Sequence, residues 1–169
     1  MVAKDEQKKL FEQNMLILKK EMENMHEEIS KGPNSIDDVR QIGITNAMAQ
    51  KIVHIDGENL ICHMSFPIRS WQTNPYGVCH GGIIATAFDN ALGGVAKWAN
   101  YGKVVTTLSL NINYLQAVHL NDNLIIKVKC VSWGKFAMAL VGESYEESTG
   151  ILTNTASAMY RILPGEKVL

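Results

Sequence analysis

The chain lacks a charge excess, a long uncharged apolar run and a targeting segment, and each absence excludes a class of protein. A formal net charge of −1 over 169 residues leaves no basic excess for phosphates, so no nucleic-acid partner is expected. The longest apolar stretch, residues 83–99, is interrupted by Asp89 and Lys97, so no membrane span is predicted. The first nine residues carry charges of both signs without an apolar core, so no targeting segment is expected.

Cysteine is scarce as well. The three cysteines, Cys62, Cys79 and Cys130, are an odd number without CxxC spacing, which argues against a disulfide framework and predicts a reducing compartment, the cytoplasm. Two of them precede a histidine, His63 or His80, and Cys–His pairs can bind zinc. Adjacent side chains on a strand point to opposite faces, however, and no second ligand pair has zinc-like spacing. We therefore expect neither a metal nor another cofactor.

Residues 1–33 have the periodicity of an amphipathic helix that ends at Gly32-Pro33. A capping box at Ser35–Asp38 then predicts a short second helix, so we place the main domain at residues 34–169. Two interpretations of the first helix stay open. It lies on the main domain or on a dimer partner, or it docks another protein. Its apolar positions recur at spacings of four and three: Phe11, Met15, Leu18, Met22, Met25 and Ile29.

The rest of the chain is mainly strand. Residues 52–66 read as a hairpin with Asp56-Gly57 as its tight turn, and residues 83–99 as a central helix. Consecutive strands with short turns, arranged around one apolar helix, predict an α+β fold in which an antiparallel sheet curls around that helix. The later strands are expected at residues 104–114, 123–132, 136–145 and 151–162.

The most informative segment is the loop at residues 74–82, which runs from Asn-Pro and Tyr-Gly into two glycines. Gly81 and Gly82 fall at the start of the central helix, where backbone N–H groups have no intrahelical acceptor and the helix dipole adds partial positive charge. Neither glycine has a side chain that blocks access. This arrangement could hold a carbonyl oxygen that develops negative charge, as an oxyanion hole does.

Asp89 is the one carboxylate in the middle of this apolar helix. Such a group is seldom left there unless it is paired or used. It could be a general base, or it could be a structural residue hydrogen-bonded to Asn90, Thr86 or a loop. His80 likewise could take part in the chemistry or only brace its loop, and Cys79 reads as a small buried side chain.

Asp89 follows Gly82 by seven residues, or about 10 Å along a helix, so the two cannot meet at one reacting carbon within one chain. Two antiparallel helices about a two-fold axis would place the N-terminus of one beside the middle of the other. We therefore predict an obligate homodimer with two identical composite sites at the subunit interface.

As a set, these residues resemble the hotdog-fold acyl-CoA thioesterases of the phenylacetate-pathway and "thioesterase superfamily member" type, over about residues 46–162. The resemblance implies a hotdog fold, assembly as dimers and often tetramers, and hydrolysis of acyl-CoA to a free acid and CoA in fatty acid metabolism. The residues that carry it are Asn74, Gly77, His80-Gly81-Gly82, Asp89-Asn90 and Leu110 to Tyr114.

The resemblance also implies roles. Gly81 or Gly82 would donate a backbone N–H to the thioester oxygen, with Asn74 and His80 shaping that end of the site. Asp89 of the other subunit would activate water or attack directly. Thr107 aligns with a water-holding hydroxyl, although strand parity groups it with Ser109 unless a β-bulge intervenes.

Three further side chains are candidates for substrate binding. Lys103 and Lys135 could pair with CoA phosphates or be ordinary solvated lysines, and Trp98 could line an acyl tunnel or belong to the core. A GxSxG nucleophile elbow is absent. Two other functions remain open. One is a non-catalytic acyl-CoA-binding protein whose first helix docks a partner, and the other is a dehydratase or hydratase of acyl thioesters.

Overall fold

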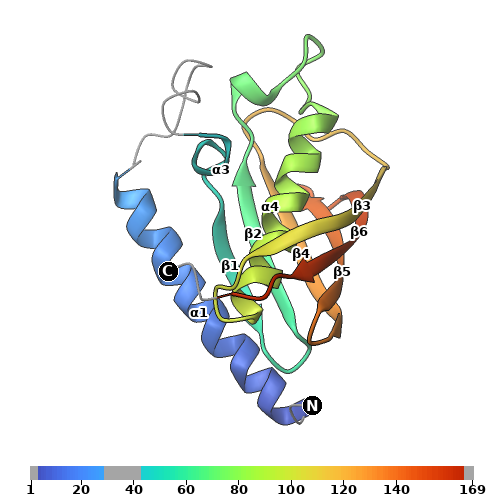
Figure 1. Cartoon of the computed structure of the whole chain (residues 1–169). Helices are drawn as coiled ribbons and strands as arrows, with labels where there is room; N and C mark the ends of the chain where they lie inside the picture. Colours follow the sequence, from blue (N-terminus) through green and yellow to red (C-terminus); the bar gives the residue numbers. More distant parts are fainter. Residues whose placement is uncertain (1–3, 29–42, 166–169) are drawn as a thin grey trace.

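The chain folds into one sheet and one long central helix, as the periodicities of its apolar residues predict. The computed structural model describes residues 4–28 and 43–165. Figure 1 shows the sheet curving around α4, with α1 lying along the outside of β1. In chain order the elements are α1 (Lys4–Glu28), α3 (Ile44–Ala47), β1 (Lys51–Asp56), β2 (Ile61–Pro67), the 3₁₀ helix η1 (Ser70–Gln72), α4 (Gly81–Ala99), β3 (Val105–Tyr114), β4 (Asn123–Trp133), β5 (Ala137–Glu146) and β6 (Leu152–Ile162).

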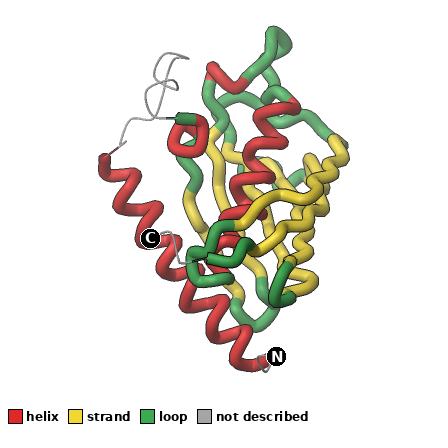
Figure 2. Tube along the Cα trace, viewed as in Figure 1, coloured by secondary structure: helices red, strands yellow, loops and turns green. Residues whose placement is uncertain are grey.

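In the described part of the chain, six strands form an antiparallel sheet in the order β1-β2-β4-β5-β6-β3 (Figure 2). Burial alternates along β2, β4 and β5, because successive side chains of a strand point to opposite faces. Gly142 of β5 leaves room for the ring of Phe88 on α4, since a Cβ at that glycine would lie 2.9 Å from it. The predicted α+β architecture, an antiparallel sheet curled around one helix, is confirmed.

The predicted hairpin is confirmed, but its turn is longer than expected. Strand β1 ends at Asp56 and β2 begins at Ile61, so the turn is not the two-residue Asp56-Gly57 type. The Asp56 carboxylate accepts hydrogen bonds from the backbone and side-chain N–H groups of Asn59, at 3.0 and 2.7 Å. The wider loop packs on α1, where a Cβ at Gly57 would lie only 2.8 Å from Cβ of Glu12.

Helix α1 lies on the main domain, which confirms one of the two interpretations left open. Its residues Phe11, Met15, Leu18 and Met22 are buried in the same core as α4 and the sheet. Near its N-terminus Lys8 forms an ion pair with Glu58. The apolar face is therefore occupied within the chain. Ile29, Gly32-Pro33, Ser35–Asp38 and the domain boundary at residues 33 and 34 lie outside the described residues, and so does the side chain of Met25.

Helix α4 is open on one side in the single chain. The sheet covers one face, whereas Gly82 is exposed and Asp89 is only half-buried. The face that carries Asp89 consists of small and polar residues, so leaving it open exposes little apolar surface. Among the helices that the structure describes, none has the length and apolarity needed to cross a membrane.

Candidate active site

Two hydroxyl groups hold the carboxylate of Asp89 in place. Thr107 of β3 donates to Oδ1 at 2.9 Å, and Tyr160 of β6 donates to the same oxygen at 3.0 Å. The other oxygen, Oδ2, has no hydrogen-bond partner among residues 4–28 and 43–165. The carboxylate is thus fixed through one oxygen while the other remains available to accept a proton.

The Tyr160 hydroxyl remains a donor because its environment opposes ionisation. Burial, followed by the negative charge of Asp89, raises the pKa of Tyr160 well above its ordinary value. Its ring lies against α4 at Gly93, where an added Cβ would be 3.3 Å from the ring. Gly93 therefore allows the phenol to come close enough to reach the carboxylate one helical turn away.

A β-bulge explains how Thr107 reaches Asp89. In the pairing of β3 with β6, Thr107 lies opposite Tyr160 and Ser109 opposite Met159, so the register shifts at Leu108. The extra residue resets the alternation of side chains, which places Thr107 and the in-facing Leu110 on the side of α4. The sequence analysis required a β-bulge for Thr107 to face Asp89 but could not locate it, and the structure places it at Leu108.

The two glycines lie at the start of α4, as predicted. His80 is the N-cap residue, but no side chain caps the helix, and the N–H groups of Gly81 and Gly82 have no acceptor within the described ranges. A Cβ at Gly82 would meet nothing within 4 Å, so the approach to this N–H is open. On the neighbouring side Tyr114 donates a hydrogen bond to the carbonyl of Gly81 at 3.0 Å.

The loop before α4 is braced by Asn74. Its Oδ1 accepts the N–H groups of Tyr76 at 2.9 Å and Val78 at 3.4 Å, which leaves only the side-chain N–H₂ for a substrate. Gly77 has φ +75°, a conformation that favours glycine. The backbone N–H of His80 donates to Gln72 at 2.9 Å while its side chain is exposed. The loop is therefore ordered, with the His80 imidazole accessible at its end.

One chain does not bring the predicted catalytic residues together. Gly82 and Asp89 lie on the same face of α4, but seven residues separate them by about 10 Å along the axis. Thr107 lies with Asp89, whereas Asn74 and His80 lie with the glycines. The site of the single chain is therefore divided into a carboxylate part and an amide part.

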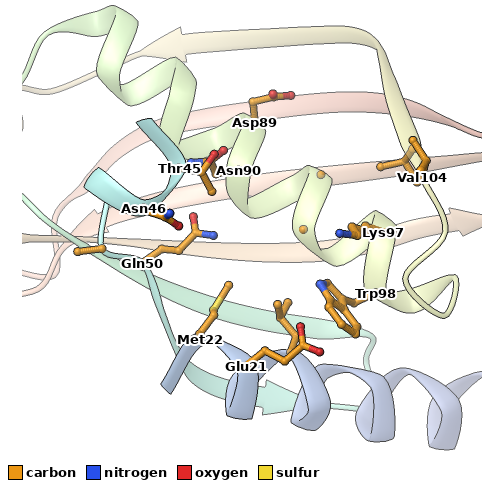
Figure 3. A pocket seen from close by; sticks show the side chains of 15 residues that line it. Glu21, Met22, Thr45, Asn46, Gln50, Asp89, Asn90, Lys97, Trp98 and Val104 are labelled. Atoms are coloured by element: carbon orange, nitrogen blue, oxygen red, sulfur yellow. The ribbon is translucent and has the colours of Figure 1, made fainter. Parts of the chain in front are cut away.

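A pocket of about 450 Å³ opens beside Asp89. Figure 3 shows its wall along α4, where Asn90, Lys97 and Trp98 are drawn together with residues of α1 and α3. Trp98, predicted as core or tunnel, is 8% exposed and lines this pocket. Lys103 and Lys135 do not line it. Lys135 is exposed, with Nζ 5.4 Å from the ring centroid of Phe136.

The cysteines do not contribute a nucleophile to the site. Burial raises the pKa of Cys79 to about 12, and likewise the pKa values of Cys62 and Cys130. Cys79 is 6% exposed, as expected for a small buried side chain. Among the residues whose placement is described, no group of three histidine, cysteine or acidic side chains could hold a metal ion.

Sequence reasoning assigned no role in the site to three residues of this region. Tyr160 and Tyr114 are strand aromatics that no local pattern connects to α4, because the contacts depend on how β6 and β3 lie over the helix. Lys97 was considered only as a charge that interrupts the apolar stretch, but it lines the pocket. Its position eight residues after Asp89 on one helix, about 12 Å away, could have indicated the shared face.

Comparison with known proteins agrees with this geometry. The family model of the Thioesterase superfamily matches residues 76–150, which include α4 and the strand that carries Thr107. A curated relative from Archaeoglobus fulgidus named "Putative esterase" is 23% identical over 95 residues, or 56% of this chain. The match spans 60% of that relative, which is less than two thirds of its length.

Two solved structures are also similar. The hypothetical thioesterase of Streptococcus pneumoniae with coenzyme A is 25% identical, with a TM-score of 0.60, over 70% of this chain and 90% of that chain. Zebrafish thioesterase superfamily member 2 is 15% identical, with a TM-score of 0.65, over 86% of this chain and 96% of that chain. With the curved sheet and the central helix, these likenesses show that the chain has a hotdog fold, and its residues 76–150 match the model of the Thioesterase superfamily.

Proposed function

We propose that this protein hydrolyses acyl-CoA thioesters to a free acid and CoA, with Asp89 as the general base. The observation that carries the proposal is the Asp89 carboxylate itself. Thr107 and Tyr160 hold Oδ1, while Oδ2 is left without a partner among the described residues and lies beside the pocket. The Streptococcus pneumoniae structure with coenzyme A supports the class of substrate.

In this mechanism Oδ2 of Asp89 takes a proton from water, and the hydroxide oxygen forms a bond to the thioester carbon. The carbonyl π electrons move to the oxygen, which becomes an oxyanion held by backbone N–H groups. When that oxyanion collapses, the C–S bond breaks and CoA leaves as a thiolate, which takes the proton from Asp89. The products are the acid and CoA, and Asp89 returns to its carboxylate form.

The oxyanion donors in this proposal are Gly81 and Gly82 of a second protomer. Their N–H groups have no acceptor in the described part of their own chain, and the space over Gly82 is open. They are too far from Asp89 of the same chain to share a reacting carbon, so a partner must supply them. Asn74 and His80 of that partner would flank the carbonyl.

The free edge of β3 supports a dimer in which this happens. Among the strands of the described residues, β3 pairs with β6 alone, and its exposed residues include Leu108 at 56% and Tyr114 at 53%. An open edge with apolar side chains is a template for another strand. Hydrogen bonds from Thr107 to Asp89 and from Tyr114 to Gly81 show that β3 runs antiparallel along α4. A second copy joined at this edge by two-fold symmetry would place its own α4 alongside.

Further parts of the proposal concern assembly, location and CoA binding. We propose that two dimers associate into a tetramer, as the resemblance implies. We also propose a cytoplasmic location, since the three buried cysteines are unpaired and free thiols persist in a reducing compartment. Lys103 and Lys135 remain candidates for the CoA phosphates, because neither lines the pocket and an ammonium group can pair with a phosphate.

A panel of acyl-CoAs from acetyl to palmitoyl tests the function by release of free thiol. We expect saturable turnover of at least one class, lost when Asp89 is replaced by asparagine. If every member binds but none is hydrolysed, the protein is an acyl-CoA-binding protein and the proposal is wrong.

A further inference from the structure

The pocket beside Asp89 extends between three helices rather than into the sheet. Residues of α1, α3 and α4 form its wall, together with Ala49 and Gln50 after α3 and with Val104 and Val105 at the start of β3. In Figure 3 Asp89 is the labelled side chain drawn farthest from α1, and Met22 and Glu21 of α1 lie at the opposite end. The cavity therefore leads from the candidate carboxylate toward the N-terminal helix.

The wall along α4 has no side chain in its middle. Gly93 and Gly94 lie between Asp89 and Trp98, so the helix backbone itself forms the middle of the wall. Asp89 and Trp98 are nine residues apart, which is about 13 Å along the helix. This is close to the extended length of a medium-chain acyl group.

Helix α1 closes the far end of the pocket. Leu18 is 5% exposed and Met22 7%, and both line the cavity while belonging to the core. Unbranched methionine fills irregular space, and its size determines how much room remains.

The helix is held firmly in this position. Phe11 is fully buried, and the Asn14 side chain donates a hydrogen bond to the carbonyl of Ala99 at the end of α4, at 3.5 Å. Glu12 also packs closely on Gly57 in the turn between β1 and β2. Together with the burial of Leu18 and Met22 nearer the pocket, these contacts hold α1 against the main domain along its buried stripe.

We infer that α1 forms the end wall of the acyl-binding pocket and limits the substrate to medium-chain acyl groups, with Met22 as the residue that sets the length. The inference rests on the proposed function. The thioester lies at Asp89, and the acyl chain runs along Gly93 and Gly94 toward Trp98 and α1. Two charged residues also line the pocket and both are half-buried: Glu21 lies on α1 beside Met22, and Lys97 lies on α4 with its Nζ 5.7 Å from the ring centroid of Trp98.

Substitutions at Met22 in the full chain test this inference. Met22→Ala lengthens the cavity and Met22→Trp shortens it, so the preferred chain length is expected to move in opposite directions. Since a methylene in an apolar pocket changes specificity by about tenfold or more, the ratio of kcat/KM for lauroyl-CoA to octanoyl-CoA should rise about tenfold in the first and fall about tenfold in the second. General destabilisation would move both variants the same way.

Ile17 provides the matched control. It lies on the exposed side of α1, at 47% exposure, about 140° around the helix from Met22. Ile17→Ala and Ile17→Trp change volume by similar amounts outside the pocket, so they should leave the ratio unchanged.

Binding of S-alkyl-CoA ethers, which cannot be hydrolysed, separates this inference from the proposed function. Opposite shifts in Kd with chain length for the two Met22 variants support the end wall even if no acyl-CoA is turned over. Turnover of acyl-CoAs with an unshifted length preference in both variants, or equal shifts in the Ile17 variants, would overturn the inference while leaving the hydrolase assignment intact.

Discussion

The two faces of helix α4 differ in composition and in what they contact. One face packs against the sheet and consists of buried apolar residues. The opposite face is half open and consists of small and polar residues. The first set includes Ala87, Phe88, Ala91, Leu92, Val95 and Ala96, and the second includes Gly82, Thr86, Asp89, Asn90, Gly93, Gly94 and Lys97.

The difference shows how one helix can carry both the stability and the chemistry of the fold. On the covered face a change of volume alters packing, because the interior is close-packed. On the open face Gly93 lets the Tyr160 ring approach the backbone, and Asp89 has one oxygen free of protein partners in the described part of the chain. Changes on the two faces should therefore affect different measurements.

The largest effect is expected for Asp89→Asn. An amide has nearly the same shape and still accepts the hydroxyl of Thr107, so folding should be kept while the general base is lost. We expect kcat to fall about a thousandfold, within the usual range for such a group. Thiol release and thermal unfolding measure the two outcomes. Asp122→Asn is the matched control, because Asp122 is another half-buried aspartate that accepts a hydroxyl, from Ser148, and kcat should not change.

Replacement of Gly82 by proline tests the amide part of the site. Proline is tolerated in the first turn of a helix and removes one N–H donor. The expected loss is about a hundredfold in kcat, since removal of one oxyanion donor has that effect. Gly82→Ala keeps the N–H and has open space for its methyl group, so it should retain most activity. Equal losses of kcat in both variants would show that the added side-chain volume, and not the missing N–H donor, lowers the activity.

A substitution on the covered face should lower the stability of the fold and leave kcat nearly unchanged. Leu92 is fully buried, so Leu92→Ala is expected to lower the free energy of unfolding by about 3 kcal/mol. Per folded molecule, kcat should remain near that of the parent. Urea unfolding with activity measured in the absence of denaturant provides both values. A large loss of kcat in the fully folded variant would contradict the separation of the two faces.

The smallest effect is expected for Tyr160→Phe, which removes one of the two donors to Asp89. A loss of about tenfold in kcat corresponds to one hydrogen bond to a charged group. Because the pKa of Tyr160 is raised, its hydroxyl stays protonated above the pH at which an ordinary tyrosine ionises. The pH profile of kcat should therefore keep its shape in this variant and only be lowered. If kcat of the parent changes at alkaline pH and kcat of the variant does not, Tyr160 titrates during catalysis and this prediction is wrong.

The sequence predicted most of the architecture because periodicity reports burial directly. The central helix and the later strands were located correctly within a residue or two. The turn at Asp56-Gly57 was wrong because its length depends on packing against α1, which is far away in the sequence. The open face of α4 was missed for a similar reason. Composition indicates how apolar a helix is, but only the fold indicates which side the sheet covers.

The residues of the candidate site were predictable where a local sequence pattern marks them. Local pattern singled out Asp89 and the two glycines as candidates, and their catalytic roles stay predictions, whereas the bulge that brings Thr107 to Asp89 was stated as a condition and is present. Tyr160 could not be found, because it is one of several alternating side chains of β6, and its contact with α4 depends on the close approach allowed by Gly93. This contact depends on the pairing register of strands that are far apart in the sequence, and no short segment of the sequence indicates that register.

The central claim is that each site combines Asp89 of one protomer with the helix N-terminus of another. Mixing Asp89→Asn and Gly82→Pro protomers by co-refolding tests it most directly. Random pairing gives heterodimers in which one of the two sites has both functional parts, so about a quarter of the parent activity should return from two nearly inactive proteins. Activity of the mixture that stays at the average of the two variants, with heterodimers shown to form, would contradict a site shared between subunits.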